Sequence, residues 1–246
     1  MSPRLQELDW GTTPMGDISL RRRRDPASGE DVYEVKLGDE YLMSSLFTAG
    51  EIALTRLGLA ELHGSGLEVA VGGLGLGYTA RAALDDPRVG SLVVIDAIGK
   101  VIEWHRKHLV PLGGQLTSDA RCRLVEGDFF TLAAGTGGLD PAAPGRRFHA
   151  VLLDIDHSPQ HVLHPHHAGL YRPEGLRRLA EHLRPGGVFA LWSNDPPSEV
   201  FTSVLADVFA RAEAHVVEFA NPLQGRTAAN TVYVAAKAEG ASAAPR

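Results

Sequence analysis

A glycine-rich turn and an aspartate after the next predicted strand are the residues best suited to binding a ligand. Gly73, Gly75 and Gly77 follow the apolar stretch 67–71 and precede a helical stretch. Glycine allows a sharp turn and a close approach of backbone to ligand, and the helix that follows presents unpaired N–H groups. Asp96 could accept hydrogen bonds from both ribose hydroxyls, although it also suits a helix cap. The glycines are spaced more tightly than in the dinucleotide fingerprint, which favours a nucleotide-like ligand without a pyrophosphate.

A second acidic group, Asp128 with Phe129, follows the strand expected at 122–125. A carboxylate there could accept a hydrogen bond from an adenine amino group, while the phenyl ring packs on the base. An ordinary strand-to-helix turn is the alternative. Because the carboxyl ends of parallel strands meet at one edge of a sheet, the glycine turn, Asp96 and Asp128 together favour a purine nucleoside.

The elements that must position these residues alternate between strand and helix. Strands are expected at 67–71, 92–95, 122–125, 150–153, 188–192, 215–218 and 231–235, and helices at 51–62, 78–84, 100–109, 173–183 and 199–211. Several strands are continuously apolar, as expected when helices cover both faces of a sheet, and the alternation implies right-handed crossovers. We therefore expect an α/β fold with a Rossmann-like, doubly wound, mostly parallel sheet.

Short strands separated by turn residues come before these elements, at 17–22, 32–37 and 41–45. They predict a small antiparallel β-meander. We expect the chain to divide into a β-meander extension (1–50), a catalytic domain (51–238) and a disordered tail (239–246) of small and polar residues. The stretch 132–147, rich in Gly, Ala and Pro, predicts a flexible surface connection.

Composition restricts the partners and the compartment. With 24 basic and 30 acidic residues, the 246-residue chain is mildly acidic, which argues against nucleic acid as a partner. The basic run Arg21–Arg24 is interpreted as a solvated strand edge. No apolar run is long enough to span a membrane, and Cys122, the single cysteine, excludes an internal disulfide framework. The first residues carry charges where a targeting segment would be apolar, so we expect a cytoplasmic protein.

These motifs resemble those of the spermidine synthase family, the polyamine aminopropyltransferases, within the class I fold of adenosylmethionine-dependent methyltransferases. The resemblance covers residues 17–237 and includes the β-meander. The family's glycine turn, usually GGGDGG, corresponds to GGLGLG; its acidic residue after the second strand corresponds to Asp96, and its GD pair to Gly127-Asp128. Its catalytic loop, usually DSTDP or DSSDP, corresponds to DIDHSP, which begins at Asp154. The resemblance implies an adenosyl-sulfonium co-substrate, a small-molecule amine acceptor and a homodimer.

Within this resemblance, Asp154 and Asp156 are the expected catalytic residues. An alkyl group bonded to a sulfonium is already activated, so the enzyme mainly aligns an amine for in-line attack and removes its proton. Asp154, at the end of the strand 150–153, is expected to be the general base, with the cap of an exposed loop as the alternative. Asp156 is expected to hold the amine or a second ammonium group through a charge-assisted hydrogen bond.

The residues expected around the donor's tail and around the acceptor depart from the family pattern. The acidic residue of the family's glycine turn is absent from GGLGLG, so the chemical identity of the donor's tail is left undecided. The family's YxE motif has no counterpart in LFTAGE, where only Glu51 offers a polar group. The second aspartate of the loop is replaced by His157 or Asp156. We expect Glu51, His157 and Asn194, the last at the end of the strand 188–192, to contact the substrate.

The catalytic loop is followed by closely spaced histidines: His157, His161, His164, His166 and His167. Imidazoles at this spacing can bind zinc. Without neighbouring cysteines or an HExxH pattern, a solvated lid is favoured, and we expect no metal. Such a lid could respond to pH, because histidines gain charge near a pKa of about 6.5. His105 and His108 are expected on an exposed helix face.

Three functional hypotheses follow. The first is transfer of an aminopropyl group from decarboxylated S-adenosylmethionine to a small amine. The second is methyl transfer from intact S-adenosylmethionine, and the third is a non-catalytic adenosyl-binding module. The aspartates of the loop favour an enzyme, and the β-meander favours the first hypothesis. The missing acidic residue in the glycine turn favours the second.

Overall fold

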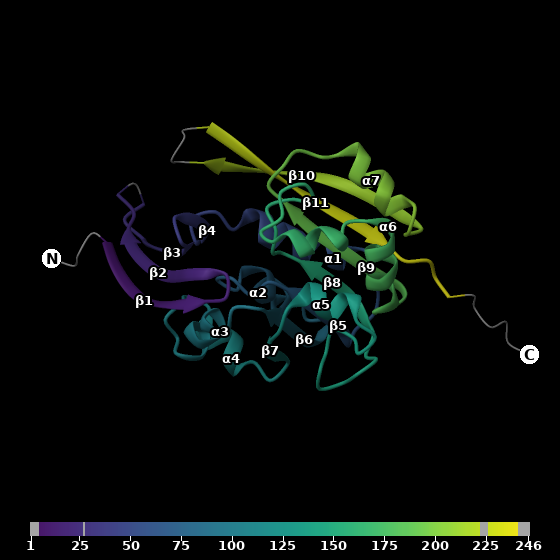
Figure 1. The fold of residues 1–246 in the computed structure, drawn as a ribbon, viewed down its shortest axis with the longest axis horizontal. Coiled ribbons are helices and arrows are strands. Elements are labelled where there is room, and N and C mark those ends of the chain that lie inside the picture. Colours follow the sequence, from purple (N-terminus) through teal and green to yellow (C-terminus); the bar gives the residue numbers. More distant parts are fainter. Residues whose placement is uncertain (1–4, 27, 222–225, 241–246) are drawn as a thin grey trace, which may run out of the picture.

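The computed structural model describes residues 5–26, 28–221 and 226–240, which form two β-sheets with flanking helices (Figure 1). The N-terminal sheet contains β1 (Leu5–Thr13), β2 (Gly16–Arg24), β3 (Asp31–Leu37) and β4 (Glu40–Ser44), in that order. The central sheet has the order β10-β11-β9-β8-β5-β6-β7. Its strands are β5 (Leu67–Gly72), β6 (Val89–Asp96), β7 (Cys122–Glu126), β8 (Phe148–Leu153), β9 (Leu183–Ser193), β10 (Arg211–Asn221) and β11 (Arg226–Ala236).

The pairings within the central sheet confirm the expected α/β class. Strands β9, β8, β5, β6 and β7 are mutually parallel, whereas β10 and β11 form an antiparallel hairpin on β9. The helices are α1 (Ala49–Ala60), α2 (Tyr78–Asp85), α3 (Gly99–Arg106), α4 (Gly113–Ser118), α5 (Phe129–Ala134), α6 (Pro173–Glu181) and α7 (Glu199–Ala206), with a short 3₁₀ helix, η1, at Pro165–Gly169.

Alternate residues of the central strands enter two separate hydrophobic cores. Val69 and Val71 of β5 face a core shared with helices α1 to α4. Ala70, between them, faces the second core, which is shared with α5, α6 and α7. Because successive side chains of a strand point to opposite faces, a sheet buried on both faces needs the continuous apolar runs that the sequence contains.

The N-terminal β-meander is confirmed, and the structure extends it by β1. This strand was missed because LQELDWGTT has little apolar alternation and its residues are mostly exposed or half-buried. Its polar side chains attach it to the helical layer instead: the carboxylate of Asp9 accepts a hydrogen bond from the indole N–H of Trp104 at 2.9 Å and pairs with Lys100 at 2.9 Å. Sequence periodicity carries no signal for an attachment of this kind.

The basic run lies on β2, but β2 is not an edge strand, because it pairs with both β1 and β3. Each arginine has an acidic neighbour. Arg21 pairs with Glu7, Arg22 and Arg24 with Asp31, and Arg23 with Glu34 and Asp25. The run is therefore neutralised within its own sheet, so it offers no open basic patch for a nucleic acid.

The segment 132–147 is more strongly anchored than a flexible connection would be. It begins inside α5, Leu139 is buried, and the buried carboxylate of Asp140 pairs with Arg123 and with Arg146. Except for residues 239 and 240, the tail expected to be disordered lies outside the described residues. Among the described residues, no helix is long and apolar enough to cross a membrane.

Candidate functional site

A cavity of about 540 Å³ lies where the N-terminal sheet meets the carboxyl ends of the parallel strands. This volume is in the range of small-molecule sites. The central sheet contributes the loops after β5, β6, β7 and β8, and the N-terminal sheet contributes the β1–β2 turn and β4. The wall consists of Thr13, Pro14, Met15, Leu42, Met43, Ser44, Phe47, Glu51, Gly73, Leu74, Gly75, Leu76, Gly77, Tyr78, Asp96, Ala97, Ile98, Asp128, Phe129, Phe130, Asp154, Ile155, His157, Leu163, His164, His166, His167 and Trp192.

The glycine turn after β5 forms the floor of this cavity. Gly73, Gly75 and Gly77 have φ angles of 96°, 47° and 93°, in the region that favours glycine. Gly73 also passes close to the loop after β8, because a Cβ there would overlap the carbonyl oxygen of Asp154. The turn thus holds the loop after β8 and the start of α2 against each other.

His105 packs beneath this turn and is fully buried, which corrects the exposed position expected for it. Its Nε2–H donates to the carbonyl oxygen of Gly75 at 2.9 Å. Burial lowers the pKa of this imidazole, so the ring is neutral and supports the turn from behind. The helical pattern was misleading because Arg106 and Lys107 are exposed, while His105 lies on the inner face of α3 beside Trp104.

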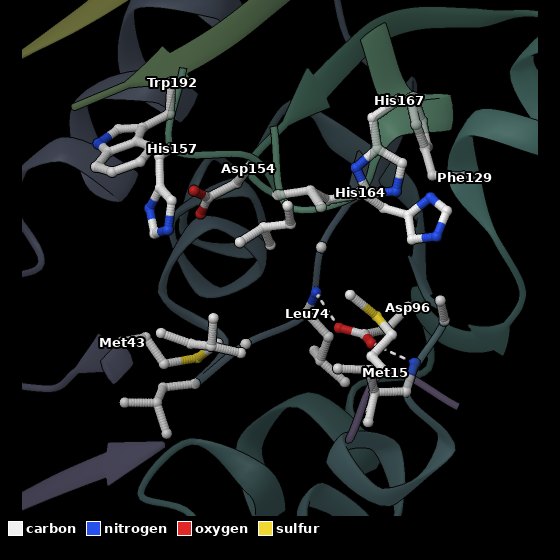
Figure 2. A pocket seen from close by; sticks show the side chains of 18 of the residues that line it. Met15, Met43, Leu74, Asp96, Phe129, Asp154, His157, His164, His167 and Trp192 are labelled. Atoms are coloured by element: carbon white, nitrogen blue, oxygen red, sulfur yellow. Dashed lines mark hydrogen bonds between the residues drawn. The ribbon is translucent and has the colours of Figure 1, made fainter. Parts of the chain in front are cut away.

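Asp96 lies at the end of β6, with its carboxylate against the glycine turn (Figure 2). It accepts hydrogen bonds from the backbone N–H groups of Leu74 at 2.9 Å and Ile98 at 2.8 Å. Burial raises its pKa, and these N–H groups oppose the shift. A carboxylate has about four acceptor positions, so Asp96 keeps capacity for a ribose hydroxyl while it fixes the turn.

Asp128 caps α5 and also lines the cavity. One oxygen accepts the N–H of Thr131 at 3.0 Å, and the other accepts from Nε2 of His166 at 2.9 Å. Burial by itself would raise the pKa of Asp128, but these hydrogen bonds outweigh burial and lower the pKa. The ring of Phe129 is buried and packs against Gly72. Asp128 is therefore a helix cap that also lines the cavity.

Asp154 directly follows β8 and points into the cavity, on the same side as His157 and Trp192 in this view (Figure 2). Its carboxylate accepts a hydrogen bond from the hydroxyl of Thr79 at 2.7 Å. Thr79 lies in the first turn of α2, so the helix that follows the glycine turn orients this carboxylate. Burial raises the pKa of Asp154 to about 6.

Glu51, from the first turn of α1, is the second carboxyl group beside Asp154. Burial, together with the negative charge of Asp154, raises the pKa of Glu51 to about 8. At neutral pH the pair therefore holds one proton, with Glu51 neutral and Asp154 ionised. A cation bound between the two would favour ionisation of both, so the pair is suited to an ammonium group.

Replacement of Glu51 by Gln should flatten the pH dependence of stability in the ligand-free protein. A carboxyl group with a raised pKa binds its proton more tightly in the folded state, so stability declines as pH rises from the ordinary value of 4.5 to about 8. Calorimetric Tm values of the wild type and Glu51→Gln should diverge across this window, with the variant more stable at the alkaline end. The exposed Glu218 provides the control, because Glu218→Gln should follow the wild type.

Asp156 does not line the cavity, although the sequence suggested that it would hold the amine. Its buried carboxylate turns inward and accepts hydrogen bonds from His167 at 2.8 Å, the Tyr171 hydroxyl at 2.7 Å and the Leu163 N–H at 2.7 Å. These contacts connect the catalytic loop to η1 and the segment before α6. Asp156 thus positions the loop that carries Asp154.

Of the two other residues predicted to contact the substrate, His157 lies in the cavity wall and Asn194 does not. His157 lines the cavity, and its Nε2–H donates to Glu40 of β4 at 2.8 Å, which connects the catalytic loop to the N-terminal sheet. Asn194 is exposed and is not part of the cavity wall; its side-chain oxygen accepts from the amide of Asn230 at 3.3 Å. The strand β9 extends to Ser193, so Asn194 already lies in the turn beyond the sheet edge.

The histidine cluster forms part of the cavity wall. His167 is buried and stacks on Phe130, with ring centroids 3.7 Å apart, whereas His161, His164 and His166 are exposed. His164 and His166 contact each other through their Nδ1 atoms at 2.6 Å. In the part of the chain that the structure describes, no group of three or more His, Cys, Asp or Glu side chains is arranged to hold a metal ion.

Several wall residues were not predicted from the sequence. Thr79, which is not in the wall but orients Asp154, could have been found, because it lies at the start of the helix that follows the glycine turn. Met15 and Met43 could not, since the N-terminal sheet has to fold over the strand ends before they reach the cavity. Together with Leu74 and Leu76 they make the cavity largely apolar around its carboxyl groups.

Solved structures that share this fold include three described as spermidine synthases or a probable spermidine synthase. The spermidine synthase of Thermotoga maritima matches with a TM-score of 0.72 at 17% identity, over 96% of this chain and 74% of that one. A spermidine synthase in complex with the transition-state analogue AdoDATO matches with a TM-score of 0.73 at 17% identity, over 96% and 75%. A probable spermidine synthase from Corynebacterium glutamicum ATCC 13032 gives 0.64 at 17% identity, over 99% and 84%.

Sequence comparison agrees with the fold. No protein-family model matches the chain. The polyamine aminopropyltransferase of Prochlorococcus marinus (strain MIT 9313) is 31% identical in an alignment of 167 residues that covers 64% of this chain and 50% of that protein. The chain thus spans about half the length of this curated relative. The chain therefore has the fold of these spermidine synthases, and part of its sequence is similar to a polyamine aminopropyltransferase.

Proposed function

We propose that this protein transfers an aminopropyl group from decarboxylated S-adenosylmethionine to a small amine. The observation that carries the proposal is the charge of the cavity wall, which contains Glu51 and Asp154 but, among the described residues, no lysine or arginine. A donor tail that ends in an ammonium group finds a counter-charge there. The carboxylate of intact S-adenosylmethionine does not find a cationic side chain.

The residues of the chain fit the adenosyl part of such a donor. Asp96 would accept a ribose hydroxyl, Asp128 would receive the adenine amino group, and the glycine turn would leave room for the backbone to approach. Because Asp128 already accepts a hydrogen bond from His166, the imidazole has to yield or share that oxygen when the purine binds. Phe129 would close the purine site from below.

The sulfonium supplies an activated carbon, so the protein needs only to align an amine and accept its proton. Asp154 is the proposed base, since it points into the cavity, is ionised at neutral pH and is oriented by Thr79. The amine nitrogen attacks the methylene carbon next to sulfur. As the new C–N bond forms, the C–S bond breaks, its electron pair goes to sulfur to give neutral methylthioadenosine, and the proton passes to Asp154.

Methyl transfer from intact S-adenosylmethionine is the second candidate, and one observation favours it. The glycine turn carries Gly75 or Leu76 where the family has an acidic side chain, and Leu74 and Leu76 make this wall of the donor site apolar. A non-catalytic adenosyl-binding module would retain the cavity without needing the pair Glu51 and Asp154.

Calorimetry with the whole protein should separate these candidates. We expect decarboxylated S-adenosylmethionine to bind at least about tenfold more tightly than the carboxylated form, because a charge-assisted hydrogen bond contributes roughly 1.5–3 kcal/mol. Mass spectrometry of amines incubated with each donor should then detect the gain of one aminopropyl group. Tighter binding of the carboxylated donor together with the gain of a methyl group would refute aminopropyl transfer, and binding without any product would indicate the module.

A further inference from the structure

The acidic side chains of the cavity differ in how many of their hydrogen-bond acceptor positions are already occupied. Asp96 accepts two backbone N–H groups, and Asp128 accepts one N–H and the imidazole of His166. Both lie on the side where the adenosine would bind. This leaves Glu51 and Asp154 as the carboxyl groups of the wall that can take a ligand ammonium group, and Asp154 uses one position for Thr79.

The two carboxyl groups, Glu51 and Asp154, match in number the two amino groups that aminopropyl transfer brings into the cavity. If the donor carries an aminopropyl tail, its terminal ammonium requires one of them, and the attacking nitrogen of the acceptor requires the other. A diamine acceptor would bring a further ammonium group into the cavity. Burying an ammonium group without a counter-charge costs several kcal/mol, so such a group needs a third acidic residue.

The candidates for a third acidic residue are all occupied or outside the wall. Asp156 is buried and uses its carboxylate for His167, Tyr171 and Leu163. Glu40 is outside the wall and accepts a hydrogen bond from His157, which is part of it. The position where a second loop carboxylate could lie is thus taken by a histidine, which carries no negative charge.

The wall next to the pair is apolar instead. Leu42, Met43, Phe47 and Trp192 also line the cavity. Figure 2 shows Met43 and Trp192 on the same side of the cavity as His157. Surfaces of this kind bind alkyl or aromatic groups through the hydrophobic effect, and methionine adapts its shape to different ligands. The surface therefore favours an acceptor whose far end is uncharged.

We propose that the acceptor is a primary amine with an apolar remainder, rather than a diamine or polyamine. This inference rests on the proposed aminopropyl transfer. The chemistry is unchanged: the amine nitrogen forms a bond to the methylene carbon of the donor, methylthioadenosine leaves, and the proton goes to Asp154. The apolar chain of the acceptor lies along Met43 and Trp192, where a second ammonium group has no partner.

Two acceptors of matched length test the inference with the whole protein and decarboxylated S-adenosylmethionine. In n-pentylamine, a methyl group replaces the second amino group of 1,4-diaminobutane. We expect kcat/KM for n-pentylamine to exceed that for 1,4-diaminobutane by at least about tenfold. An equal or higher value for 1,4-diaminobutane overturns the inference and leaves aminopropyl transfer in place. Alkylation of neither amine overturns both.

The variant His157→Asp should reverse the preference, because it places a carboxylate where the second ammonium group would lie. We expect the ratio of the two kcat/KM values to shift about tenfold towards 1,4-diaminobutane. His63→Asp is the matched control: it makes the same change at an exposed residue outside the cavity wall and should leave the ratio unchanged. An unchanged ratio in His157→Asp overturns the assignment, and the wild-type comparison stands even if this variant does not fold.

Discussion

Asp154→Asn should lower kcat by about 10²- to 10⁴-fold while donor affinity stays close to that of the wild type. The amide cannot accept a proton from the attacking amine, but its oxygen can still accept the hydrogen bond from Thr79, so the loop keeps its conformation. Release of methylthioadenosine measures the rate, and calorimetry measures binding of the donor. A wild-type rate in Asp154→Asn would remove this residue from the mechanism.

The pH profile of the wild type provides an independent check on the same residue. With the pKa of Asp154 raised to about 6, kcat/KM should fall on the acid side with an apparent pKa near that value, since the base must be ionised in the free enzyme. The exposed Asp207 gives the matched control, because Asp207→Asn should keep both the rate and the acid limb.

Gly73→Ala should lower kcat/KM by about 100-fold or more, even though the change adds a single methyl group. The new Cβ would overlap the carbonyl oxygen of Asp154, so the catalytic loop or the glycine turn must move. A displacement of about 1 Å at a catalytic group costs about 100-fold in rate. The strained φ of 96° adds roughly 1–3 kcal/mol of destabilisation.

Gly64→Ala separates these two contributions. Gly64 has a similar φ of 82°, but a Cβ there would meet no atom within 4 Å, and the residue lies outside the cavity wall. Its substitution should lower the Tm while leaving kcat/KM unchanged. If Gly64→Ala and Gly73→Ala lose activity to the same extent, the close approach between the turn and Asp154 has no role in the reaction.

The alternation of strands and helices made the central sheet predictable from the sequence. It also placed Asp96 and Asp154 correctly in the cavity wall, because a polar residue that directly ends a buried parallel strand faces the ligand edge. A few residues beyond the strand this rule weakens. Asp156 follows Asp154 by two positions, yet its backbone has turned and its carboxylate lies under the loop.

The remaining features depend on contacts between segments that are far apart in the sequence. Glu51 enters the wall from α1, and its pKa of about 8 arises from burial and from Asp154, which no local pattern encodes. His105 became buried because the glycine turn packs on α3. The contact of His157 with Glu40 requires the N-terminal sheet to lie over the strand ends, so it is defined only when both sheets are in place.

The position of the cavity between the two sheets has a thermodynamic consequence. Met43 and the β1–β2 turn belong to the wall that the N-terminal sheet contributes, while Asp96 and Asp154 belong to the wall that the central sheet contributes, and the Asp9 contacts with Trp104 and Lys100 help to hold the two walls together. A ligand that touches both walls binds only to the closed arrangement and therefore stabilises it by mass action. Ligand affinity and the attachment of the N-terminal sheet are then a single linked equilibrium, in which the substrate acts as part of the interface between the sheets.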